Sequence, residues 1–186
     1  RFLGRDVTRM PPMARCLSGM GRTFQIPQPF EKLTVFENLL VAGAFGSERG
    51  EADVADRCAE ILVDTGLIDK ANMLAGSLSL LERKRLELAR ALATEPKLLL
   101  LDEMVSGMNQ EETEDIARFV LDIRDELGIT VVMIEHEMRI VMDISDRIHV
   151  LNFGRKIAEG DPAAVLADPH VKRAYLGEQH AVTRHG

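Results

Sequence analysis

The chain has 186 residues, of which 46% are hydrophobic and 4% aromatic, and its formal net charge is −7. This length suits one ordinary domain with its own core, and the high aliphatic content favours a compact α/β or helical protein over a disordered one. The negative charge argues against a nucleic-acid-binding protein, because such proteins usually carry a basic surface. No apolar run reaches the roughly 20 residues of a membrane helix, so we expect a soluble or peripheral protein.

The first thirty residues are rich in turns. The chain opens on Arg1, and residues 2–7 are typical of the end of a β-hairpin, so we expect that an N-terminal segment is missing. Prolines and glycines between residues 11 and 21 predict turns, and residues 22–26 predict a short strand. Gln25 would then lie at the mouth of the loop that begins at Pro27.

The region 31–95 has a helical pattern throughout. Thr34 and Glu37 have the spacing of a capping box and predict a helix, which the segment from Gly43 to Glu51 breaks. A second helix is predicted over residues 52–65. A third is predicted over 81–94, with an apolar stripe from which Arg83, Glu87 and Arg90 point away.

The pattern changes after Pro96. Residues 97–101 predict a strand buried on both faces, which is typical of a parallel sheet. Asn109 can cap a helix that Gly128 ends, and residues 129–134 predict the next strand, which completes a βαβ unit. Two further strands are predicted over 147–151 and 155–159, followed by a frayed tail from Gly177.

Chemically active side chains follow the two strands of the βαβ unit. Asp102 and Glu103 follow the first strand, and Glu135 and His136 follow the second. A right-handed crossover brings them to the carboxyl edge of the sheet, where open α/β folds bind ligands. Such a group suits a nucleotide triphosphatase. Taken singly, the acids suit a solvated strand end and the histidine a structural role. The phosphate-binding sequence Gly-x-x-x-x-Gly-Lys-Ser/Thr does not occur in these residues.

A segment before Pro96, Leu78-Ser79-Leu80-Leu81-Glu82-Arg83-Lys84-Arg85-Leu86, completes a recognisable order of motifs. The Gln25 loop, the helical insert, this segment, the Asp102-Glu103 pair and His136 together resemble the ATP-binding subunit of an ABC transporter over nearly the whole chain. The stretches 22–27, 33–38 and 174–178 resemble the subunits of branched-chain amino acid importers.

The resemblance implies an α/β fold, with a P-loop NTPase-like parallel sheet and an ABC-type helical subdomain, truncated at its N-terminus. It divides the chain into 1–30 (the end of a β-subdomain and the Q-loop), 31–95 (the helical subdomain), 96–176 (the rest of the ATPase core) and 177–186 (a flexible tail).

The resemblance also assigns roles to individual residues. Gln25 would reach Mg²⁺ and the attacking water, Asp102 would hold Mg²⁺ through water, and Glu103 would act as the general base. His136 would contact the γ-phosphate of ATP. Asn109 would lie in the D-loop, facing a second subunit, although a helix cap alone also explains it.

The signature loop departs from the family pattern Leu-Ser-Gly-Gly-Gln. Leu80, Leu81 and Glu82 replace its last three residues. A leucine side chain obstructs the approach of phosphate to the backbone, and the carboxylate of Glu82 would repel it. Ser79 remains the best phosphate ligand at this helix start, and Leu81 and Glu82 would lie beside it. Ser79 and Glu82 also have capping-box spacing, so a purely structural role is open.

We therefore expect a subunit that binds and hydrolyses ATP with Mg²⁺ and powers an importer for branched-chain amino acids. Its partners would be a second ATP-binding subunit, identical or different, and integral membrane permease subunits, at the cytoplasmic face of the membrane; nucleic acid is not an expected partner. The 186 residues alone would be inactive and marginally stable, with exposed apolar strand edges. The alternative is a non-catalytic partner with a degenerate site. A chromosome-maintenance ATPase is disfavoured, because the interval between Gln25 and Ser79 leaves no room for a long coiled coil.

Overall fold

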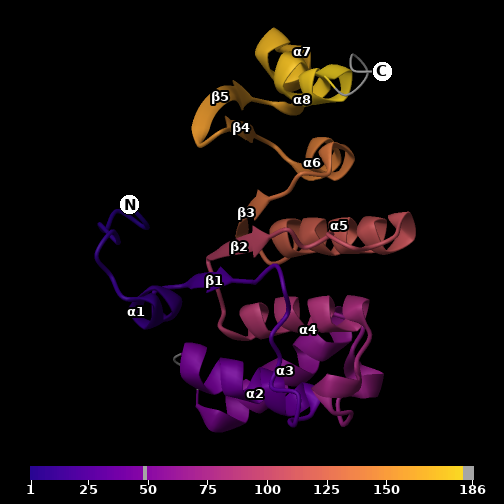
Figure 1. The fold of residues 1–186 in the computed structure, drawn as a ribbon. Helices are drawn as coiled ribbons and strands as arrows, with labels where there is room; N and C mark the ends of the chain where they lie inside the picture. Colours follow the sequence, from indigo (N-terminus) through magenta and orange to yellow (C-terminus); the bar gives the residue numbers. More distant parts are fainter. Residues whose placement is uncertain (48–49, 182–186) are drawn as a thin grey trace. The chain divides into compact units, whose positions relative to one another are not determined.

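The computed structural model describes residues 1–47 and 50–181, and the chain forms two compact units that divide between Glu135 and His136 (Figure 1). The elements of the first unit are α1 (Pro12–Leu17), β1 (Met20–Arg22), α2 (Val35–Gly46), α3 (Glu51–Asp64), the short 3-10 helices η1 (Ile68–Lys70) and η2 (Ala75–Ser77), α4 (Leu80–Ala93), β2 (Leu98–Asp102), α5 (Gln110–Asp125) and β3 (Thr130–Ile134). Those of the second unit are α6 (Met138–Ile144), β4 (Ile148–Asn152), β5 (Arg155–Gly160), α7 (Pro162–Ala167) and α8 (Pro169–Ala181). Within the described part of the chain, no helix has the length and apolar character needed to cross a bilayer.

The sheet of the first unit is parallel, with the strand order β1-β2-β3. Asp102 pairs with Ile134 at its carboxyl edge, so the predicted βαβ unit is confirmed. Leu99 and Leu101 are fully buried, whereas Leu98 and Leu100 on the opposite face are half-buried. The prediction that this strand is buried on both faces is therefore met on one face only.

Three helices, α2, α3 and α4, pack together in the first unit (Figure 1). The helix that begins at Thr34 does not end at Gly43 as expected but continues to Gly46. Gly43 instead permits close packing, since a Cβ atom there would lie 2.6 Å from Cγ1 of Val54. The glycine therefore serves a helix–helix contact and not a helix end.

The N-terminal segment differs from the expected series of turns. Residues 12–17 form α1, which begins with Pro12, a residue well suited to the first turn of a helix. The strand expected over 22–26 lies earlier, over Met20–Arg22. The expected hairpin end is a single antiparallel bridge between Phe2 and Arg5, across Leu3 and Gly4, which both have positive φ.

The second unit is built on an antiparallel hairpin of β4 and β5, as predicted. Phe153 and Gly154 have positive φ and form its tight turn. The core of this unit consists of Ile148, Val165 and Val171. Helix α8 continues through the segment 177–181, for which a frayed tail was expected, and residues 182–186 of that expected tail lie outside the described residues.

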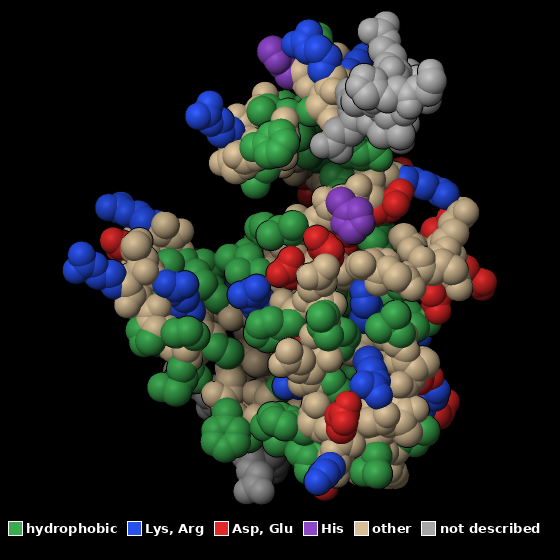
Figure 2. Space-filling model, in the orientation of Figure 1, with side chains coloured by type: hydrophobic (Ala, Val, Ile, Leu, Met, Phe, Trp, Pro, Cys, Tyr) green, Lys and Arg blue, Asp and Glu red, His purple; other side chains and the backbone are tan. Residues whose placement is uncertain are grey.

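Many large hydrophobic side chains are exposed. Figure 2 shows such side chains among acidic and basic ones on the visible face of the first unit. The exposed residues of that unit include Phe24, Ile26, Phe30, Phe45, Val132 and Ile134.

Candidate functional site

The backbone turns sharply where β2 ends. Glu103 has a φ of 45°, in the left-handed region that side-chain-bearing residues seldom adopt. Its amide donates a hydrogen bond to the carbonyl oxygen of Ile134 at 2.9 Å, which ties the turn to the end of β3. Backbone strain of this kind persists only where the surroundings hold it, and it is frequent at functional sites.

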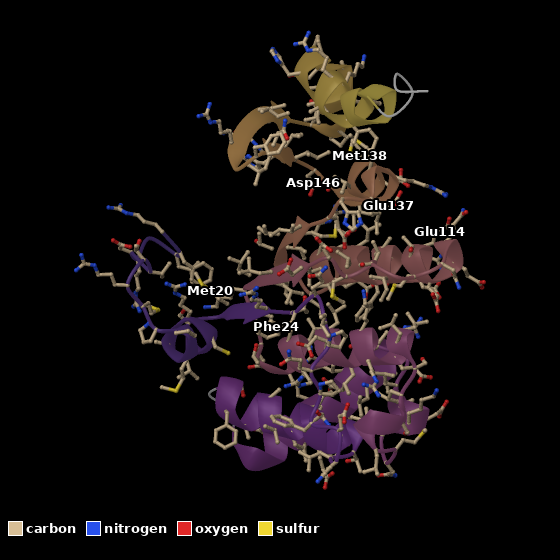
Figure 3. All side chains as sticks on the ribbon, in the orientation of Figure 1. Met20, Phe24, Glu114, Glu137, Met138 and Asp146 are labelled. Atoms are coloured by element: carbon tan, nitrogen blue, oxygen red, sulfur yellow. The ribbon has the colours of Figure 1, made fainter. Side chains whose placement is uncertain are left out.

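The loop after β1 brings an amide side chain to this turn. Nε2 of Gln25 donates a hydrogen bond to Oε2 of Glu103 at 2.6 Å, although 78 positions separate the two residues. Arg22 forms an ion pair with Asp102 at 3.2 Å, and the amide of Thr23 donates to the carbonyl of Leu100 at 3.0 Å. Met20 and Phe24, labelled in Figure 3, mark the course of this segment. The structure thus places Gln25, Asp102 and Glu103 at one edge of the sheet.

The oxygens gathered here suit Mg²⁺ bound together with a phosphate substrate. The described residues contain no group of three or more His, Cys, Asp or Glu side chains that could hold a metal ion by themselves. Mg²⁺ needs no such cage, because it keeps several waters and takes one or two carboxylates plus phosphate oxygens. Asp102, half-buried at the strand end and adjacent to Glu103, meets that requirement.

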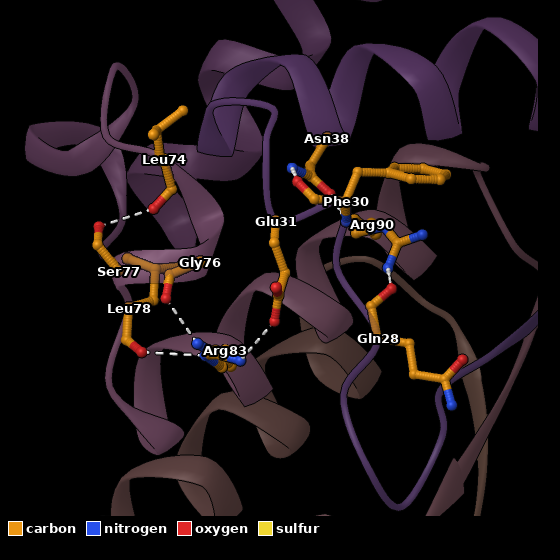
Figure 4. A network of polar contacts seen from close by, with 10 residues as sticks. All are labelled: Gln28, Phe30, Glu31, Asn38, Leu74, Gly76, Ser77, Leu78, Arg83 and Arg90. Carbon is orange, nitrogen blue, oxygen red and sulfur yellow. Dashed lines mark hydrogen bonds and ion pairs between the residues drawn. The ribbon is translucent and has the colours of Figure 1, made fainter.

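Helix α4 holds the Gln25 loop through an ion pair whose carboxylate is buried and whose guanidinium is half-buried. Glu87 is 5% exposed and pairs with Arg90 at 2.9 Å. Burial raises the pKa of Glu87, and this rise is opposed by Arg90 and by hydrogen bonds from the amides of Gln28 and Phe24. Arg90 also donates to the carbonyl of Gln28 at 3.0 Å and lies over the ring of Phe30 (Figure 4).

The role of this pair was not predicted, since Glu87 and Arg90 were expected away from the apolar stripe. Two opposite charges three residues apart, flanked by leucine and alanine, were the available signal.

The segment 78–86, here called the signature segment, contains the start of α4, which has a capping box. The amide of Ser79 donates to Oε2 of Glu82 at 2.8 Å, and the amide of Glu82 donates to Oγ of Ser79 at 3.4 Å. The other carboxylate oxygen of Glu82 forms an ion pair with Lys70. Lys70 therefore offsets the charge that was expected to repel phosphate. Leu80 is exposed and Leu81 half-buried at the same helix start.

Arg83 fixes the backbone that leads into Ser79 (Figure 4). Its guanidinium donates to the carbonyls of Leu78 at 3.0 Å and Gly76 at 2.6 Å, and it pairs with Glu31 at 3.4 Å. This contact joins the signature segment to the residues that follow the Gln25 loop. The sequence predicted only that Arg83 points away from the apolar stripe of its helix.

Asn109 caps α5, since its Oδ1 accepts a hydrogen bond from the amide of Glu112 at 2.9 Å. Its side chain is exposed, so the cap leaves the residue accessible. His136 is the first residue of the second unit and is also exposed. The sheet edge of the first unit thus contains Gln25, Asp102 and Glu103, while Ser79, Leu81 and Glu82 mark the start of α4.

Comparison with known proteins gives consistent matches. A family model described as "ABC transporter" matches residues 1–106, and one described as "Branched-chain amino acid ATP-binding cassette transporter" matches residues 155–181. The chain is 38% identical to the high-affinity branched-chain amino acid transport ATP-binding protein LivG of Salmonella typhimurium, over 94% of this chain and 74% of that protein. It is 37% identical to BraF of Pseudomonas aeruginosa, a protein with the same description, over 96% of this chain and 75% of that protein. The solved ADP conformation of an ATP-binding cassette of an ABC transporter superposes with a TM-score of 0.82 at 34% identity, covering 93% of this chain and 74% of that one.

Proposed function

The chain belongs to the ABC transporter family of ATP-binding proteins, and on that premise we propose that it is the ATP-hydrolysing subunit of an importer for branched-chain amino acids. The family and the α/β fold were both predicted from the sequence and are confirmed. The choice of solute is supported by the printed names of LivG and BraF and by the match of residues 155–181.

The observation that carries the hydrolytic function is the hydrogen bond between Gln25 and Glu103 beside Asp102. A general base must lie within reach of the water it deprotonates, and a second polar group must orient that water. Glu103 is the base in this proposal, and the Gln25 amide orients both the Glu103 carboxylate and the water. Asp102, oriented by Arg22, would hold Mg²⁺ together with Gln25. When bound, Mg²⁺ supplies charge neutralisation at the transferred phosphoryl group.

Further residues act on the nucleotide in the same proposal. His136 contacts the γ-phosphate of ATP, and Ser79 offers its hydroxyl and the start of α4 to ATP held by a facing subunit. Leu81 and Glu82 border that contact, and Asn109 lies in the loop that meets the facing subunit. The partners are thus a second ATP-binding subunit and membrane permease subunits, with the protein peripheral at the cytoplasmic face and residues 31–95 as its helical subdomain.

Residues 1–186 contain no Gly-x-x-x-x-Gly-Lys-Ser/Thr sequence, so we expect no ATP turnover from these residues by themselves. The test therefore uses the polypeptide expressed from its complete reading frame. Glu103→Gln should retain ATP binding and lower phosphate release by about 10²–10⁴-fold, the usual effect of removing a general base. Glu111→Gln, a matched change at an exposed carboxylate on α5, should leave turnover unchanged. Undiminished turnover in Glu103→Gln would refute the assignment of the base.

A second candidate function is that of a non-catalytic partner subunit. It is favoured by Leu80, whose exposed side chain stands at the start of α4 where phosphate would approach the backbone. Under this reading, ATP turnover appears only after a different ATP-binding subunit is added. Turnover by the purified homodimer supports the first function and excludes the second.

A further inference from the structure

Lys84 is a buried cation to which the proposed reaction assigns no role. It lies in the second turn of α4 and is 3% exposed. Its Nζ donates hydrogen bonds to the carbonyl oxygens of Met104 and Ser106, each at 2.7 Å, and to that of Glu103 at 3.4 Å. An ammonium group has three donors, and here all three face backbone carbonyls of one turn.

The turn that Lys84 contacts is the one that carries the candidate base. The left-handed backbone of Glu103 directs its carbonyl group to the α4 side, while the amide of Glu103 is bound by Ile134. Two residues further along the turn, the amide of Val105 donates a hydrogen bond to Oε1 of Glu135 at 3.1 Å. Lys84 therefore binds three acceptors of the turn, and residues 134 and 135 at the end of β3 bind the amides of Glu103 and Val105. The amide of Ser106 donates within the turn, to the carbonyl of Glu103 at 3.4 Å.

The choice of lysine at this position follows from these carbonyls. Burying an ammonium group is unfavourable unless hydrogen bonds and opposite charges compensate for lost water. Burial lowers the pKa of Lys84, and the carboxylates of Glu135 and Glu103 act in the opposite direction. Apart from Glu87, the other buried positions of α4 are filled by leucine and alanine, so an apolar residue would meet the packing requirement alone. An apolar residue would deprive the carbonyls of Met104 and Ser106 of this donor, whereas the carbonyl of Glu103 would keep the 3.4 Å hydrogen bond from the amide of Ser106.

We propose that Lys84 is a positioning residue, which fixes the turn 103–106 so that the Glu103 carboxylate stays directed at Gln25, and which joins that turn to the helix that begins at Ser79. The inference rests on the proposed function only in naming Glu103 as the base. Because Ser79 caps the helix that contains Lys84, a displacement of the α4 start reaches the Glu103 turn directly.

The first test examines the turn itself, in the full chain and without nucleotide. In Lys84→Met, the amides of residues 104–108 should exchange with solvent at least about tenfold faster relative to the amides of Leu99 and Leu101. The ¹³Cα chemical shift of Glu103 should also lose the value typical of positive φ. Arg85→Met removes a cation from the same helix, one whose partner is Asp115, and should change neither signal.

Unchanged exchange and an unchanged Glu103 shift in Lys84→Met would overturn the proposal. Equal acceleration of the turn and of β2 would also overturn it, because it would indicate a general loss of stability. Should Lys84→Met not fold, Lys84→Gln is judged by the same comparison, with acceleration of at least about threefold expected since its amide can satisfy only part of the carbonyl set.

The second test uses the ATPase assay of the complete polypeptide. Misplacement of the base should lower kcat by about tenfold or more in Lys84→Met while KM for ATP changes by less than about threefold. A raised KM with unchanged kcat would overturn the positioning role. Absence of turnover in the wild-type protein would refute the proposed function alone, because the exchange experiment does not depend on hydrolysis.

Discussion

At the scale of single residues, the buried carboxylate of Glu87 and the half-buried guanidinium of Arg90 on α4 bind the loop that follows β1. A buried ion pair contributes little net stability, because the loss of water opposes the attraction. Both partners instead contact the segment 24–30, through the Gln28 carbonyl, the amides of Phe24 and Gln28, and the Phe30 ring. The pair therefore contributes little to the free energy of unfolding, and its main effect is to fix the position of the Gln25 loop.

The raised pKa of Glu87 predicts a pH dependence of stability. A carboxyl group whose pKa is higher in the folded state than its usual 4.5 contributes stability that is fully present below pH 4.5 and is lost as pH rises through the folded pKa. Urea unfolding of the wild-type chain and of Glu87→Gln should show the wild type losing stability relative to the variant over that interval. The loss should be about 1.4 kcal/mol for each unit of difference in pKa. A difference between wild type and variant that stays constant with pH would contradict the prediction.

At the scale of elements, three helices of the first unit begin with complete capping boxes. These are Thr34 with Glu37, Ser79 with Glu82, and Asn109 with Glu112. In each box, a side-chain oxygen and a carboxylate satisfy two backbone amides at the helix start. The candidate site therefore borders two helix starts, those of α4 and α5, whose positions are set locally by the sequence.

Asn109→Ala should lower the free energy of unfolding by about 1 kcal/mol, because the amide of Glu112 loses its acceptor. Asn109→Asp should retain the wild-type value, since aspartate is an equally good cap. Chemical denaturation of the three proteins measures both effects. An Asn109→Asp protein as unstable as Asn109→Ala would show that the residue acts through contacts other than the cap.

In the β4–β5 hairpin, several basic side chains surround Glu159. This carboxylate is paired with Arg147 and Lys156 and lies 3.4 Å from Nδ1 of His149. Hydrogen bonds from Lys156 and Arg147 lower the pKa of Glu159 to about 2. Its contribution to stability is therefore present above pH 4.5 and lost as pH falls toward about 2. NMR titration of this side chain should give a midpoint near 2 in low salt and a higher one at about 1 M salt, where exposed pairs are screened. A midpoint that does not respond to salt would contradict the exposed ion-pair explanation.

Local signals account for what the sequence predicted of these elements. The starts of α2, α4 and α5, the βαβ unit and the β4–β5 hairpin follow from caps, periodicity and turn residues within a few positions of each other. Gly43 was misread as a helix end because its role depends on Val54, a residue of another helix. The same reason explains the missed role of Lys84, whose acceptors begin 19 positions later in the chain. That Gln25 and Glu103 serve one site was expected only through the family resemblance, and the hydrogen bond between them was not predicted, since no local pattern joins these residues.

At the scale of the whole molecule, opposing features govern the association of the 186 residues. A net charge of −7 disfavours contact between copies at low salt. Among the described strands, β3 pairs only with β2, so its other edge has no described partner. Val132 and Ile134 on this strand are 51% and 62% exposed. Exposed apolar edge strands favour pairing with other chains.

We therefore expect these 186 residues, when expressed alone, to be monomeric at low salt and to self-associate at about 1 M salt, where the Debye length falls to about 3 Å. Ile134→Lys should abolish most of the association, because a lysine on an edge strand opposes pairing. Phe153→Lys removes an exposed hydrophobic side chain from the β4–β5 turn and is the matched control, which should associate as the wild type does. Sedimentation velocity at both salt concentrations distinguishes these cases. A wild-type chain that stays monomeric at high salt would show that the β3 edge is not a pairing surface.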